Sequence, residues 1–171
     1  TISDASRVLQ GMLSALTYLH GSGITHNNIK PAKILYERQL GVILIGFGAA
    51  TMEGNDTPVY GTPWFLPPEA ALQHGRTRPS PATDIWALGV VMLFLLRRLN
   101  LGQEQQGVWS LDRVLADPEE RLDVNVALAM WHQVIVKQRD SLAQGNTRLH
   151  RVVVEMLDAD AEKRAKLSRP F

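Results

Sequence analysis

Apolar residues recur at helical spacing in three separate stretches of the chain. The first stretch follows Ser3 or Asp4, either of which can cap a helix, and it ends at the glycines of GSG, residues 21–23. The second lies around Trp131 and the third around Val153. Each predicts a helix with one buried face, formed in turn by Val8, Leu9, Met12, Leu13, Leu16 and Leu19; by Ala127, Met130, Trp131, Val134 and Ile135; and by Leu149, Val152, Val153, Met156 and Leu157.

Residues 85–96 differ from these stretches because they are apolar on every side. Such a helix is expected at the centre of a bundle. Its longest apolar run, residues 87–96, has ten residues, whereas a helix that spans a bilayer needs about 20. The pattern therefore predicts a buried core helix, and neither a membrane span nor a signal peptide is expected.

A small β-hairpin is predicted from residues 34–36 and 42–45, which are joined by the turn sequence ERQLG. The next segment, residues 46–83, is rich in Gly, Pro and Thr. We expect no regular structure there apart from a short helix at 67–73, and a segment of this length is usually functional or mobile.

The second half of the chain contains one further irregular region. Residues 100–123 are polar and aperiodic, with DPEER at 117–121 predicted to form a capped turn. DADAEK, residues 158–163, predicts a connection that leads to a last short helix. The pattern as a whole predicts one mainly helical domain over residues 1–171.

The overall composition excludes several classes of function. The chain has 18 Lys and Arg against 17 Asp and Glu, a net charge near +1, which gives no electrostatic basis for binding nucleic acid or an acidic membrane. Cysteine is absent, so disulfides, thiolate metal sites and thiol nucleophiles are excluded.

Five sequence motifs follow one another along the chain. They are HNNIKPAKIL (26–35), GFG (46–48), GTPWFLPPE (61–69), DIWALGVV (84–91) and LDADAEKR (157–164). In these motifs, and over nearly its whole length, the chain resembles the C-terminal lobe of serine/threonine protein kinases, with the weakest likeness at 97–145. The resemblance implies a mainly α, kinase-like C-lobe, a helical bundle with a small β-hairpin. It implies a catalytic-loop region at 24–36, an activation-segment-like region at 46–69 and a central helix at 84–97.

The resemblance assigns the family's chemical positions to residues that differ from the family pattern. Kinases use an Asp as base, and an Asn and the D-F-G Asp as magnesium ligands. Asn28 stands at the base position and has no basic carboxylate. Lys33 stands at the position of the metal-binding Asn and would repel a divalent cation, while Gly46 has no side-chain oxygen for magnesium. We therefore expect no functioning catalytic residue among His26, Asn28, Lys30, Lys33 and Gly46, no metal-binding or cofactor-binding residue, and no productive binding of ATP and magnesium.

Other matched positions are expected to shape the lobe without reacting. His26 is interpreted as a packed structural histidine. The resemblance implies that Asp84 holds the backbone of the catalytic loop and that Glu69 pairs with Arg164 in the interior. The full set of structural motif residues is Phe47, Gly48, Thr62, Glu69, Asp84 and Arg164.

These assignments predict a protein that is not an enzyme: an inactive, pseudokinase C-lobe acting as a protein-binding or scaffold module. No Gly-rich G-x-G-x-x-G loop occurs in the chain, so the N-terminal lobe is expected to be absent. The expected partner is an unidentified protein bound through residues 46–69 or 97–125, and a homodimer could form through the face that an N-lobe would cover. Neither nucleic acid nor a membrane is expected as a partner, and the expected location is intracellular, in the cytoplasm or nucleus. The alternative is a fragment of a larger kinase-like protein that binds ATP or retains atypical phosphotransferase activity.

Overall fold

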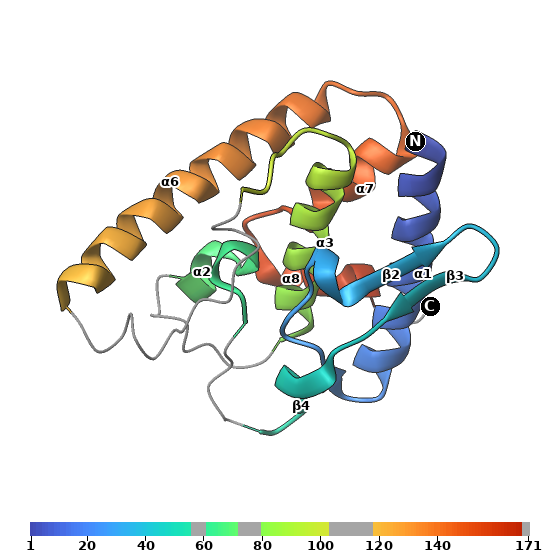
Figure 1. Ribbon diagram of the computed structural model, residues 1–171, viewed down its shortest axis with the longest axis horizontal. Helices are drawn as coiled ribbons and strands as arrows, with labels where there is room; N and C mark the ends of the chain where they lie inside the picture. The colour runs from blue at the N-terminus through green and yellow to red at the C-terminus, as the bar shows by residue number, and fades with distance from the viewer. Residues whose placement is uncertain (56–60, 72–79, 103–117, 169–171) are drawn as a thin grey trace.

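The computed structural model describes residues 1–55, 61–71, 80–102 and 118–168. The described part is a mainly helical bundle with two small antiparallel sheets, which confirms the predicted fold class. Figure 1 shows α3 (Pro81–Leu95) in the middle of the bundle and the long α6 (Pro118–Ala143) along one side. The other helices are α1 (Ile2–Gly21), α2 (Pro68–Ala71), α7 (Arg148–Met156) and α8 (Ala161–Ala165).

The central helix α3 forms because its sequence is apolar on every side and its start is strongly marked. The hydroxyl of Ser80 caps the helix by accepting from the backbone N–H of Ala82, and Pro81 occupies the first turn. The helix contacts α1, α6, α7 and α8, and twelve of its fifteen residues are buried. The expected bounds of 84–97 were wrong at both ends, because the Ser-Pro start signal extends the helix to residue 81 and Arg97 takes a left-handed φ of 57° after its end.

The predicted hairpin is confirmed as β2 (Ile34–Glu37) paired with β3 (Gly41–Leu44). Its inner face packs on α1, where a Cβ at Gly11 would lie 2.8 Å from the Cβ of Val42. The outer face carries Leu35 and Ile43, which lie opposite each other in the pairing register and are 51% and 52% exposed. The hairpin therefore presents an apolar pair away from the bundle.

The expectation of no regular strand in residues 46–83 was wrong. Strand β4 (Thr51–Met52) pairs antiparallel with β1 (Ile24–Thr25). Strands of two residues are too short to show an alternating pattern, so the sequence gives no signal for them. This small sheet joins the catalytic-loop region to the segment that follows GFG.

The expected turn at 117–121 was also wrong, because α6 begins at Pro118 and continues to Ala143. Proline followed by acidic residues is a usual helix start, which our interpretation assigned to an isolated turn. The short helix predicted at 67–73 is present as α2, although residues 72 and 73 lie outside the described residues.

The first helix is capped by Thr1 in a capping box with Asp4, two or three residues before the expected cap. Of the predicted irregular region at 100–123, residues 103–117 lie outside the described part. None of the described helices is long and apolar enough to cross a membrane.

Candidate functional site

The catalytic-loop region is held by the carboxylate of Asp84 on α3. Asp84 is fully buried, and its two oxygens accept from the backbone N–H groups of His26 and Asn27, both at 2.8 Å. A third donor, Nε2 of His20, lies 2.9 Å away. Hydrogen bonds to a charged acceptor are stronger than neutral ones, so the central helix fixes the conformation of the loop backbone. The structure thus places Asp84 against the loop backbone, as the resemblance implied.

Asn27 joins this loop to the segment after GFG. Its φ of 65° lies in the left-handed region, which asparagine tolerates better than most residues. Its side-chain amide donates to the carbonyl oxygen of Ala49 and to the hydroxyl of Thr51, both at 2.9 Å. These bonds reinforce the pairing of β1 with β4, so the two segments keep a fixed relation.

His26 is a buried ring whose two nitrogens have different partners. Its Nε2–H donates to the carbonyl oxygen of Ile45 at 3.1 Å, and its Nδ1 accepts from the N–H of Asn28 at 3.2 Å. The ring also meets Phe47 edge to face, with centroids 5.0 Å apart. Burial is the main cause that lowers the pKa of His26, the charge of Lys33 lowers it further, and Asp84 acts in the opposite direction. The geometry suits a neutral, structural ring.

Because His26 is buried and neutral, we predict that the free energy of unfolding decreases as the pH falls below neutrality. Because the pKa of folded His26 is lowered, the unfolded chain binds a proton more readily, and stability declines as the pH falls below the usual histidine value of about 6.5. Burial lowers the pKa of His132 in the same direction. The free energy of unfolding, measured between pH 7.5 and 5, should decrease toward pH 5, and His26→Gln should show a smaller change with pH. Equal or greater stability at pH 5 would contradict the neutral assignment.

Asn28, at the position of the family's base, contacts the loop of residues 61–69 that leads into α2. Its amide oxygen accepts from the hydroxyl of Thr62 at 2.9 Å, and Thr62 itself is buried. Trp131 and His132 on α6 support the same loop by donating to the carbonyl oxygens of Trp64 and Leu66, at 2.8 and 3.0 Å. An amide here can orient a hydroxyl group by hydrogen bonding, although it cannot take up a proton as a carboxylate does.

Lys30 and Lys33 lie at the two ends of the 3₁₀ turn Pro31–Lys33. Burial and, secondly, the charge of Lys33 lower the pKa of Lys30. Lys33 also lies against Gly46, which follows β3 and is exposed. Phe47 is half exposed and Gly48 is exposed. The structure therefore brings both lysines and the GFG motif to one edge of the loop, where Lys30 lies two residues after Asn28 in the chain.

Glu69 and Arg164 form the ion pair that the resemblance implied. Arg164 is fully buried, and it also donates to the carbonyl oxygen of Asp158 at 2.7 Å and to that of Ala82 at 3.3 Å. Its guanidinium carbon lies 5.4 Å from the ring centroid of Trp86. This arginine, on α8, connects Glu69 on α2 to the central helix at Ala82.

Sequence reasoning missed His20 and Ser168, which complete the support of Asp84. Nε2–H of His20 donates to Asp84, and the hydroxyl of Ser168 lies 2.6 Å from Nδ1. A Ser–His–Asp chain can serve as a nucleophile and its base, but Ser168 is only 1% exposed, so no substrate can reach it. The sequence did indicate that His20 faces the interior, because it lies four residues after Leu16 and therefore on the same face of the helix.

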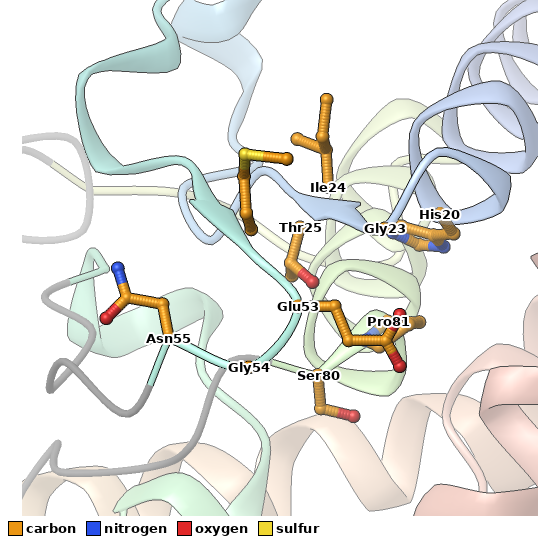
Figure 2. Close-up of a pocket in the computed structure, with 10 residues that line it drawn as sticks. His20, Gly23, Ile24, Thr25, Glu53, Gly54, Asn55, Ser80 and Pro81 are labelled. Carbon is orange, nitrogen blue, oxygen red and sulfur yellow. The ribbon is translucent and has the colours of Figure 1, made fainter.

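A hollow of about 180 Å³ lies beside this chain of hydrogen bonds. Figure 2 shows its lining, which comes from the end of α1, from β1 and β4, and from the start of α3, with Thr25, Glu53 and Ser80 among the polar residues. Neither Lys30 nor Lys33 lines it, so it is separate from the catalytic-loop edge. No group of three or more His, Asp or Glu side chains within the described ranges is arranged to hold a metal ion.

Comparison with known proteins adds to this geometry. Residues 1–169 match the family described as "Protein kinase domain". The chain is 31% identical over 199 aligned residues to serine/threonine-protein kinase H1 homolog of Danio rerio, covering 96% of this chain and 46% of that protein. It is 32% identical to serine/threonine-protein kinase ssp1 of Schizosaccharomyces pombe, over 77% of this chain and 26% of that protein. Human serine/threonine-protein kinase H1 is 36% identical over 56% of the chain. The chain thus spans less than half the length of these curated relatives.

These matches correct one expectation from the sequence. We expected a chain that is not an enzyme, but the relatives that it matches are named serine/threonine-protein kinases, which points to enzymatic activity. The departures at Asn28, Lys33 and Gly46 therefore do not justify assigning the chain to a non-enzymatic class. From its match to the family over almost its entire length and from the names of its relatives, the chain belongs to the protein kinase family.

Proposed function

We propose that the chain is the C-terminal lobe of an atypical serine/threonine kinase that binds ATP along the catalytic-loop edge and transfers its terminal phosphoryl group to a protein hydroxyl. The kinase names of the relatives support this reaction class. The observation that carries the proposal is the catalytic loop itself. Asp84 holds it in a fixed conformation, with Lys30 and Asn28 on its edge.

The surface formed by the hairpin and the two lysines suits a nucleotide, which has an apolar base at one end and charged phosphates at the other. The exposed pair Leu35 and Ile43 offers an apolar platform for a base. Lys33 immediately precedes the strand β2 that carries Leu35, Lys30 lies three residues earlier, and both offer positive charge for phosphates. In the proposed complex the base lies on the hairpin and the phosphates extend toward Asn28.

Phosphoryl transfer at this edge depends on positioning and charge neutralisation more than on a strong base. The acceptor hydroxyl oxygen bonds to the terminal phosphorus, the bond from that phosphorus to the bridging oxygen breaks, and ADP leaves with the electron pair. The hydroxyl proton passes to a phosphoryl oxygen or to water, because Asn28 cannot accept it. Asn28 orients the hydroxyl, and Lys30 stabilises the charge on the phosphoryl oxygens.

The test is transfer of label from γ-labelled ATP to serine or threonine in a mixture of peptides, with the intact protein as enzyme. We expect transfer, and we expect Lys30→Ala to reduce its rate by about 100-fold, as is typical for loss of one charge-stabilising group. The matched control is Lys163→Ala, which removes an exposed lysine on α8 and should leave the rate unchanged. Absence of transfer with or without magnesium, or equal rates for the two variants, would contradict the proposal.

Binding of a protein partner and formation of a homodimer stay predictions. Met130 and Val134, which the sequence pattern assigns to the buried face of α6, are exposed. With Val126 they form an apolar row spaced four residues apart, which supports a protein partner on that side of the lobe. Light scattering of the intact protein measures the dimer directly, and a monomer at all concentrations would exclude it.

A further inference from the structure

Lys33 fills the space beside Gly46. The φ of Gly46 is 80°, and a Cβ built there would lie 2.6 Å from Nζ of Lys33 and 2.7 Å from its Cδ. A Cβ at this position would require the flexible end of the Lys33 side chain to move. The end of the Lys33 side chain therefore occupies the place where a side chain of residue 46 would begin.

Magnesium does not fit the residues present at this place. The ion requires hard oxygen ligands in near-octahedral geometry, and kinases supply them from an asparagine and the D-F-G aspartate. The corresponding residues here are an ammonium group at Lys33 and a glycine at 46. A divalent cation would thus meet a fixed positive charge and no carboxylate from these positions.

The same residues form a compact cationic site. Lys30 precedes the turn Pro31–Lys33 and Lys33 ends it, and the backbone N–H of Lys33 donates to the carbonyl oxygen of Lys30 at 2.9 Å, which keeps the two lysines close to each other. Ile45 donates its N–H to the carbonyl oxygen of Lys33 at 2.9 Å and so fixes the turn against the end of β3. Within residues 1–55, 61–71, 80–102 and 118–168, neither ammonium group forms an ion pair. Two neighbouring ammonium groups without a carboxylate partner favour a multiply charged anion.

We propose that Lys33 takes the place of the magnesium ion, so that Lys30 and Lys33 together bind the phosphate groups of ATP without a divalent cation. This inference rests on the proposed function, which assigns ATP to this edge of the lobe. The glycine at 46 and the lysine at 33 then form a matched pair, because the end of the Lys33 side chain lies where a side chain of residue 46 would begin. Lysine is a common binder of phosphate as a point charge, and it needs no set of oxygen ligands around it.

The test is calorimetric titration of the intact protein with ATP, once with EDTA and once with magnesium. We expect binding in EDTA that magnesium does not strengthen, because the Mg–ATP complex brings a second cation to an occupied place. Lys33→Gln should weaken the binding in EDTA by about tenfold or more, the usual effect of one charge-assisted contact. Lys163→Gln, the matched control on α8, should bind as the wild type does.

A double variant tests whether magnesium binding can be restored when Lys33 is removed. Lys33→Asn with Gly46→Asp removes the ammonium group and supplies two oxygen-bearing side chains, and aspartate is among the residues that tolerate a positive φ. Its ATP binding should require magnesium. Wild-type binding that requires magnesium would overturn the inference and leave the proposed function standing. No binding of ATP by the wild type under either condition would overturn the proposed function as well. If the double variant does not fold, the effect of Lys33→Gln on ATP binding in EDTA tests the inference by itself.

Discussion

Replacing Asp84 with alanine is expected to lower the free energy of unfolding by about 4 kcal/mol, because it leaves the buried N–H groups of His26 and Asn27 without an acceptor. It also removes the acceptor of the Nε2–H of His20, whose Nδ1 keeps its contact with Ser168. Asp84→Asn keeps the volume but turns a donor toward one of these N–H groups, so about 2–3 kcal/mol should be lost. The measurement is unfolding of the intact protein in urea.

Hydrogen exchange locates this effect on the catalytic loop. The backbone amides of His26 and Asn27 should lose protection in both variants before the amides of α3 do, since Asp84 is their only acceptor in the described structure. Glu155→Gln is the control, because Glu155 is an exposed acid on α7, and such surface changes stay within about 0.5 kcal/mol. Unchanged protection at residues 26 and 27 in Asp84→Asn would contradict the role given to this carboxylate.

Arg164→Met is expected to lower the free energy of unfolding by about 3 kcal/mol, near the lower limit for breaking a buried ion pair from one side. We expect a loss near the lower limit because the Glu69 side chain is 40% exposed, so water can solvate its carboxylate in the absence of the arginine. The carbonyl oxygens of Ala82 and Asp158 lose their donor as well. Unfolding in urea measures the loss, and Arg164→Lys should recover only part of it because lysine cannot reach several acceptors at once.

The two partners of this pair should differ in their effects. Glu69→Gln leaves Arg164 with its backbone acceptors, so we expect a loss of about 1 kcal/mol, the usual value for a single hydrogen bond. Equal losses for Glu69→Gln and Arg164→Met would mean that the carboxylate, and not the set of carbonyl acceptors, is what stabilises the buried guanidinium.

The sequence pattern predicted the elements whose burial is strongly periodic or complete. The buried stripe of α1 and the apolar α3 leave few alternatives, and the turn sequence between two short apolar runs identifies the hairpin of β2 and β3. The pattern failed where structure depends on partners distant in sequence. The pairing of β1 with β4, which involves two residues on each side, is such a case. The prediction at Pro118, where α6 starts, failed for a different reason, because a local helix-start signal was taken for a turn.

In the candidate site, too, the sequence predicted some features and not others. Residue types at motif positions identified the family and the departures at Asn28, Lys33 and Gly46. They did not show that Lys33 reaches Gly46, because this contact depends on the position of the 3₁₀ turn relative to the end of β3. The sequence alone indicates that Lys33 repels a metal ion. The structure adds that its side chain fills the space beside Gly46. This contact is the basis for proposing a phosphate site without a metal ion.

The most direct measurement of the central claim is an experimental structure of the intact protein with ATP bound in the presence of EDTA. Our account predicts phosphate oxygens within hydrogen-bonding distance of Nζ of both Lys30 and Lys33, and the base on Leu35 and Ile43. Phosphates bound elsewhere, or a nucleotide that binds only together with a magnesium ion beside Gly46, would contradict it.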